Sequence, residues 1–137
     1  MRRLPLLAVL AVLALALAGC GGSGAPKNTI KITFGRTAGL IVPYSITIAR
    51  DGKVTAKGTP PVEPPATLTN AEAERLSRLV RSQIGKLNST LFCAHTLPDE
   101  ASSFITALGK TVAVRGGCEP RFTKLFYELT NALGLNE

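Results

Sequence analysis

Apolar and polar residues alternate in three consecutive stretches near the start of the folded part of the chain. Such alternation is typical of strands that bury one face. Asp51-Gly52, which separates the second stretch from the third, is the strongest hairpin-turn signal in the sequence. The pattern therefore predicts strands over residues 29–35, 41–50 and 53–58.

Two later stretches have apolar residues at helical spacing. Thr69-Asn70-Ala71-Glu72 has the form of a capping box, in which Thr and Glu side chains bond the first amides of a helix. Pro120 suits the first turn of a second helix, where its missing amide is not needed, and Gly134 is typical of a helix end. The predicted buried stripes are Leu76, Leu79, Val80, Ile84 and Leu87 in the first helix, and Phe122, Leu125, Phe126, Leu129 and Leu133 in the second.

A second hairpin lies between the two helices. Alternation predicts strands over residues 102–107 and 111–115, whereas residues 87–101 show no regular pattern. Residues 59–66 contain four prolines and are expected to be an extended crossing segment. The order β-β-β-α-β-β-α predicts an α+β fold over residues 29–135, an antiparallel sheet with both helices packed on one face.

A different pattern precedes this domain. Arg2-Arg3 is followed by 13 uninterrupted apolar residues, Leu6 to Ala18, fewer than the roughly 20 that a membrane-spanning helix needs. The run ends in Leu17-Ala18-Gly19-Cys20, which resembles the lipobox of bacterial lipoproteins. That resemblance implies that residues 1–19 are a cleaved signal peptide and that Cys20 carries the acyl chains. In the alternative, the signal is a non-lipidated secretory one and this cysteine is incidental.

The residues that follow the lipobox, together with the charge of the chain, indicate where the protein is located and what it binds. Residues 20–28 are rich in Gly and Ser, which is typical of a flexible tether. Because Gly21 is not Asp, the lipoprotein resemblance implies the outer membrane in a two-membrane cell, or the outer face of the cell membrane otherwise. The chain carries 16 Lys and Arg against 9 Asp and Glu. Export argues against nucleic acid as their target, so the expected partners are the lipid bilayer and an envelope protein.

The two remaining cysteines are expected to pair. Outside the cytosol disulfides persist, and Cys93 and Cys118 allow only one pairing. The bridge closes a loop of about 25 residues, which corresponds to roughly 3 kcal/mol of stabilisation. A metal site built from these cysteines with His95 and Asp99 conflicts with the usual zinc spacing. The sequence therefore predicts no metal and no cofactor.

Several short matches follow one another in the order of a known family. They are Ile30-Lys31-Ile32, Arg36-Thr37-Ala38-Gly39-Leu40, Leu68-Thr69 with Glu72 and Leu76, and Pro98-Asp99 before a hairpin and a closing helix. In this order residues 30–133 resemble emfourin, a small bacterial inhibitor of thermolysin-type metallopeptidases, or related envelope domains. The family's Gly pair is here Ala38-Gly39, and the cysteine pair and the Pro-rich segment are additions. The resemblance implies the fold class and no particular inhibitory residue.

These features favour a membrane-anchored envelope lipoprotein whose small domain binds a protein or inhibits a peptidase, without being an enzyme. The candidate binding loop contains Arg36, Gly39 and Leu40, because a flexible backbone there presents a cation beside an apolar side chain. One alternative is an envelope hydrolase in which His95 acts as the general base together with Asp99 or Glu100. Another is a structural spacer of the envelope that has no specific ligand.

Overall fold

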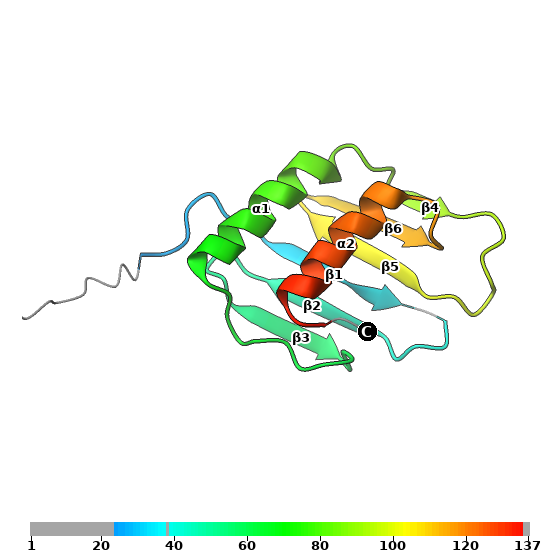
Figure 1. Ribbon diagram of the computed structural model, residues 1–137, viewed down its shortest axis with the longest axis horizontal. Helices are drawn as coiled ribbons and strands as arrows, with labels where there is room; N and C mark the ends of the chain where they lie inside the picture. Colours follow the sequence, from blue (N-terminus) through cyan, green and yellow to red (C-terminus); the bar gives the residue numbers. More distant parts are fainter. Residues whose placement is uncertain (1–23, 38, 136–137) are drawn as a thin grey trace, which may run out of the picture.

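The computed structural model describes residues 24–37 and 39–135, which form a six-stranded sheet with two helices on one face (Figure 1). The predicted signal peptide and Cys20 lie outside the described residues. The α+β class and the order of the predicted elements are confirmed. The strands are β1 (Ile32–Thr37), β2 (Tyr44–Ile48), β3 (Val54–Gly58), β4 (Thr90–Phe92), β5 (Ser102–Ala107) and β6 (Lys110–Arg115), and the helices are α1 (Asn70–Ile84) and α2 (Pro120–Ala132).

The strands lie in the order β3-β2-β1-β5-β6-β4. Every neighbouring pair is antiparallel except β4 and β6, which are parallel, so the sheet is mixed and not antiparallel throughout as predicted. Strand β4 lies within the stretch 87–101, for which the sequence predicted no regular structure. Its three residues are too few to show an alternating pattern, and its pairing depends on β6, more than fifteen residues later. This strand closes the edge of the sheet next to the predicted disulfide.

The core lies between the sheet and the helices. In β1, Ile32 and Phe34 are fully buried and face the helices, and the register sets Phe34 opposite both Ile46 and Ile105. Phe34 also meets Phe126 of α2 edge to face, with ring centroids 5.8 Å apart. The predicted stripes of both helices are buried in this layer, apart from Leu79, which is half-buried. Alternation in the strands and helical spacing therefore position the same apolar core.

Local signals set the ends of the elements. The hydroxyl of Thr69 accepts a hydrogen bond from the amide of Glu72 at 3.2 Å and caps α1, as predicted. Gly134 has φ +67°, the left-handed conformation that ends α2. Strand β2 begins only after Pro43, because proline has no amide to donate to the sheet.

Residues 24–30 run along α1 rather than away from it. The side-chain amide of Asn70 donates to the carbonyl of Gly24 at 2.6 Å, and the amide of Lys27 donates to the carboxylate of Glu74 at 2.8 Å. The predicted flexible tether is thus bonded to the domain from residue 24 onward. None of the helices within the described residues is long and apolar enough to cross a bilayer.

Candidate binding site

Two loops meet at one end of the sheet: residues 39–43, between β1 and β2, and residues 93–101, between β4 and β5. We call these two segments the loop end. The amide of Leu40 donates to the carbonyl of Asp99 at 3.0 Å. Gly39, at φ +77°, lies so close that a Cβ would come within 2.4 Å of the same carbonyl oxygen. The contact therefore requires glycine, because a side chain would be both strained and crowded there.

The loop end exposes large apolar side chains. Leu40 is 85% exposed, Val42 is 61% exposed and Leu97 is 65% exposed. A single exposed apolar side chain is common on protein surfaces. Here three of them lie on two adjoining loops and give this end of the domain an apolar character. Apolar side chains on loops held by a rigid sheet are typical of binding surfaces.

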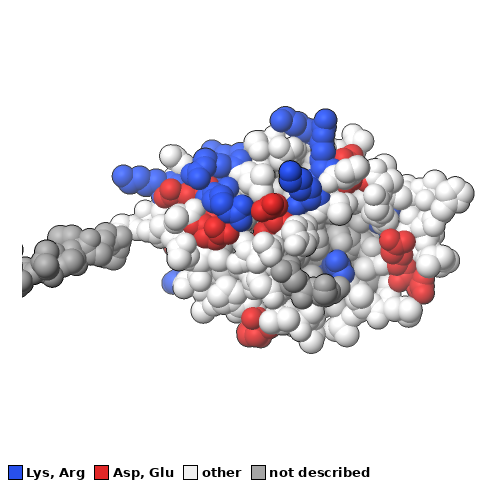
Figure 2. Space-filling model, in the orientation of Figure 1, with Lys and Arg blue, Asp and Glu red and all other residues white. Residues whose placement is uncertain are grey.

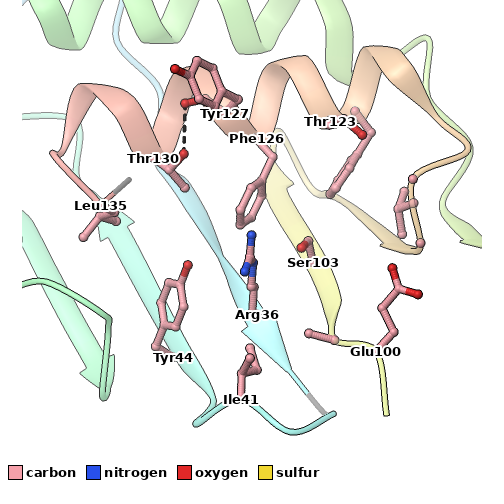
Figure 3. Close-up of a pocket in the computed structure, with 15 residues that line it drawn as sticks. Arg36, Ile41, Tyr44, Glu100, Ser103, Thr123, Phe126, Tyr127, Thr130 and Leu135 are labelled. Atoms are coloured by element: carbon pink, nitrogen blue, oxygen red, sulfur yellow. Dashed lines mark hydrogen bonds between the residues drawn. The ribbon is translucent and has the colours of Figure 1, made fainter. Parts of the chain in front are cut away.

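A cleft of about 580 Å³ opens beside the loop end, between α2 and the adjoining ends of β1, β2 and β5 (Figure 3). Its walls are aromatic, with Phe126 and Tyr127 on the α2 side and Tyr44 on β2. Hydroxyl groups and one carboxylate complete a mixed lining. The lining residues are Arg36, Ile41, Tyr44, Glu100, Ala101, Ser103, Val114, Gly116, Gly117, Phe122, Thr123, Phe126, Tyr127, Thr130 and Leu135.

Arg36 lies in this cleft and not in the loop that was predicted to contain it. Strand β1 extends to Thr37, so the predicted loop begins two residues too early. The register pairs Arg36 with Tyr44 and with Ser103, and its side chain points to the helix side of the sheet (Figure 3). The guanidinium carbon lies 5.5 Å from the centroid of the Phe126 ring, a cation–π distance. Of the predicted loop residues, Arg36 therefore belongs to the cleft and Leu40 to the exposed surface, while Gly39 allows the loops to meet.

Covalent and polar contacts fix the second loop. The predicted disulfide between Cys93 and Cys118 is present, with 5.6 Å between the α-carbons. Arg115 donates from one nitrogen to the carbonyls of Leu97, at 3.2 Å, and of Pro98. Gly116, at φ +95°, packs against the bridge, since a Cβ there would lie 2.7 Å from the Cβ of Cys93. The disulfide and Arg115 thus hold the loop that carries Leu97.

The residues considered for hydrolysis are not assembled into one site. His95 is exposed, has φ +61° and does not line the cleft. Glu100 lines the cleft, whereas Asp99 contributes its backbone carbonyl to the contact between the loops. A general base needs a partner that orients it, and neither carboxylate bonds the imidazole. Within residues 24–37 and 39–135, no three His, Cys, Asp or Glu side chains are grouped closely enough to hold a metal ion.

An ion-pair cluster joins the two helices away from the loop end. Arg75 donates to Glu72 at 2.8 and 3.1 Å and to Glu128 of α2 at 3.1 Å. The hydrogen bond from Arg75 lowers the pKa of Glu72, although partial burial of the carboxylate opposes the effect. The hydrogen bonds from both carboxylates raise the pKa of Arg75. The cluster ties α1 to α2 and is structural.

Comparison of the chain with protein-family models, with curated proteins and with solved structures finds no significant match. The lipoprotein signal and the emfourin-like pattern therefore stay predictions from the sequence. The candidate site rests on the geometry of the loop end and the cleft. Sequence reasoning identified Arg36, Gly39 and Leu40 but missed the second loop and α2, which complete the site.

Proposed function

We propose that the protein is a membrane-anchored lipoprotein of the bacterial envelope whose domain binds a partner protein through the loop end and the adjoining cleft, without catalysis. One observation carries this proposal: the tether and the loop end lie at opposite ends of the sheet (Figure 1). Strand β1 begins where the docked tether finishes and leads directly to the first of the two loops. Its six residues span about 20 Å. An anchor at Cys20 therefore leaves the loop end accessible to other envelope proteins.

The chemistry of the loop end supports a protein partner. Leu40 and Leu97 offer apolar area that is removed from water on binding. Arg36 places its guanidinium against the Phe126 ring in the wall of the cleft, so this wall combines aromatic and charged groups. The emfourin resemblance adds a metallopeptidase as one partner of this kind.

The first test is photo-crosslinking in intact cells. A photoreactive amino acid replaces Leu40 or Leu97 in separate strains, and Leu108 serves as the matched control because it is also exposed, at 58%, but lies on the β5–β6 turn. We expect one protein adduct, identified by mass spectrometry, from both loop-end positions and not from the control. The same adducts from all three positions, or none from the loop end, would contradict the proposal. The second of these results would favour the spacer alternative.

The captured partner then allows a quantitative test with purified proteins. We expect Leu40→Ser combined with Leu97→Ser to weaken binding by at least tenfold, and Leu108→Ser to leave the affinity unchanged. Arg36→Gln is expected to weaken binding by a similar factor, since the cation–π contact that shapes the wall of the cleft is lost. A loss of biological activity in His95→Ala with binding retained would instead support the hydrolase.

A further inference from the structure

The end of the domain opposite the loop end has its own chemistry. Four basic side chains, Lys27, Lys31, Arg50 and Lys53, are exposed there. Lys27 and Lys31 lie in the segment before β1, and Arg50 and Lys53 lie at the turn between β2 and β3; the two segments meet where the hydroxyl of Thr29 donates to the carbonyl of Arg50 at 2.6 Å. We call these four residues the basic end. Two carboxylates lie near these cations: Asp51 is 3.8 Å from the ammonium of Lys53, and Glu74 accepts a hydrogen bond from the backbone amide of Lys27. Four cations and two carboxylates leave this region with a net positive charge.

A shallow hollow of about 300 Å³ lies within this end of the sheet. Lys31 and Arg50 form its charged walls, and Leu108 and Gly109 of the β5–β6 turn form another side. Leu108 stands at the tip of this turn and is 58% exposed. This arrangement fits the interface of a bilayer, where anionic phosphates lie above acyl chains. The two cations suit the phosphates, and the exposed leucine suits the apolar region beneath them.

The length of the tether decides which part of the domain comes near the membrane. The carbonyl of Gly24 is bonded to Asn70 at the start of α1. Three residues lie between Gly24 and Cys20, and the four Cα-to-Cα steps reach at most about 14 Å. The loop end is farther from the anchor by the length of β1. Electrostatic attraction to a charged membrane acts over about 10 Å, and this tether is short enough to let the basic end come within that range.

The distribution of charge over the rest of the surface agrees with this orientation. Figure 2 shows Lys and Arg over the two helices, but with Asp and Glu among them, and Arg75 is engaged by two carboxylates. At the right of Figure 2 acidic side chains gather where Figure 1 shows the β4–β5 loop, which contains Asp99 and Glu100. An anionic surface would repel these two groups. The helix face is thus mixed in charge, and the loop end carries the exposed carboxylates.

We infer that the basic end rests on the headgroups of anionic phospholipids, with Lys31 and Arg50 on the phosphates and Leu108 at the interface, so that the domain stands with its loop end outward. This inference rests on the proposed anchor at Cys20. It adds to that proposal a defined membrane-facing surface and a preference for acidic lipid.

Lysine labelling of the acylated full-length protein tests the inference. The protein is reconstituted in vesicles of phosphatidylcholine alone and in vesicles that contain 30% phosphatidylglycerol, and an amine-reactive reagent is added. We expect Lys31 and Lys53 to react at least threefold more slowly on the acidic vesicles at low salt, and this protection to disappear in 0.5 M salt, because the attraction is screened. Lys57 and Lys124, which are exposed elsewhere on the domain, should react equally on both vesicles. Protection of all four lysines, or of none, would overturn the inference.

A pair of matched variants separates this surface from a general effect of charge. Lys31→Gln with Arg50→Gln and Lys57→Gln with Lys124→Gln each remove two positive charges. We expect the first double variant to lose the protection of Lys53 on acidic vesicles and the second to keep it. Equal loss in both would show that only net charge matters and would overturn the inference. The mass of the amino-terminal peptide reports acylation independently: an unmodified peptide overturns the anchor and the orientation together, whereas uniform labelling of an acylated chain overturns the orientation alone.

Discussion

The carbonyl oxygen of Asp99 lies directly against the α-carbon of Gly39. It accepts the amide of the next residue, Leu40, at 3.0 Å, and it occupies space that any side chain at position 39 would need. Two loops from distant parts of the chain are thereby fixed to each other without a side-chain contact. The relative positions of Leu40 and Leu97 depend on this junction, and so does the shape of the proposed binding surface.

Gly39→Ala is expected to disrupt the junction. Alanine at φ +77° is strained, and its Cβ would lie 2.4 Å from the Asp99 oxygen and 2.8 Å from the amide nitrogen of Ala101. We expect the free energy of unfolding to fall by about 2–4 kcal/mol. Gly109→Ala is the control, because Gly109 has φ +74° but has no neighbouring atom within 4 Å of the added Cβ. That variant should lose only about 1–2 kcal/mol. Equal losses in urea unfolding would show that crowding at Asp99 does not matter.

Removal of the disulfide should destabilise the domain and loosen the loop that follows β4. We expect reduction of the wild type, or the double variant Cys93→Ala, Cys118→Ala, to lower the free energy of unfolding by about 3 kcal/mol. Hydrogen exchange should become faster in residues 94–101 and stay unchanged in the β2–β3 turn, which has no contact with the bridge. A reductant should have no effect on the double variant. If it destabilised that variant as well, the loss in the wild type could not be assigned to the bridge.

Much of the fold could be predicted because its signals are local. The turn Asp51-Gly52, the cap at Thr69 and the end of α2 at Gly134 each depend on a few neighbouring residues, and all three occur where the sequence predicted them. Strand β4 could not be predicted in this way. It has three residues, and only the pairing with β6 makes it a strand.

The candidate site was harder to predict because its parts come from different elements. Arg36 continues the alternation of Ile32 and Phe34, so the same period that predicted β1 also predicts that this arginine faces the helices. The predicted strand nevertheless ended at residue 35, and Arg36 was placed in the loop that follows it. The contact with Phe126 and the junction between Gly39 and Asp99 depend on how α2 and a second loop pack, which no local pattern reveals.

Stability in acid should depend on the pair of Glu72 and Arg75. Hydrogen bonds from Arg75 lower the pKa of Glu72 from its ordinary value of 4.5. A lowered pKa in the folded state stabilises the protein above pH 4.5, and this stabilisation is lost as the pH falls through the folded value. Since both side chains are partly exposed, the loss should be less than about 1 kcal/mol.

The variant Glu72→Gln isolates this contribution, because glutamine keeps the shape of the side chain and does not titrate. We expect the free energy of unfolding of the variant to fall less steeply than that of the wild type between pH 5 and pH 2.5. Glu63→Gln, at an exposed position in the Pro-rich segment, removes the same charge and should follow the wild-type curve. An acid limb of Glu72→Gln as steep as that of the wild type would contradict the assignment.

A buried hydroxyl contributes to the connection between the tether and the domain. The Oγ of Ser77 accepts the amide of Ile30 at 3.1 Å, and Ser77 is only 1% exposed. Ser77→Ala leaves that amide buried without an acceptor, and we expect a loss of about 1–3 kcal/mol even though alanine favours the helix. Ser82→Ala is the control, since Ser82 is exposed and its hydroxyl bonds only the carbonyl of Leu79 within α1. Urea unfolding gives the stabilities, and hydrogen exchange at Ile30 should be faster in the first variant alone. If the two variants behaved alike, the docking of residues 24–30 on α1 would not depend on this bond.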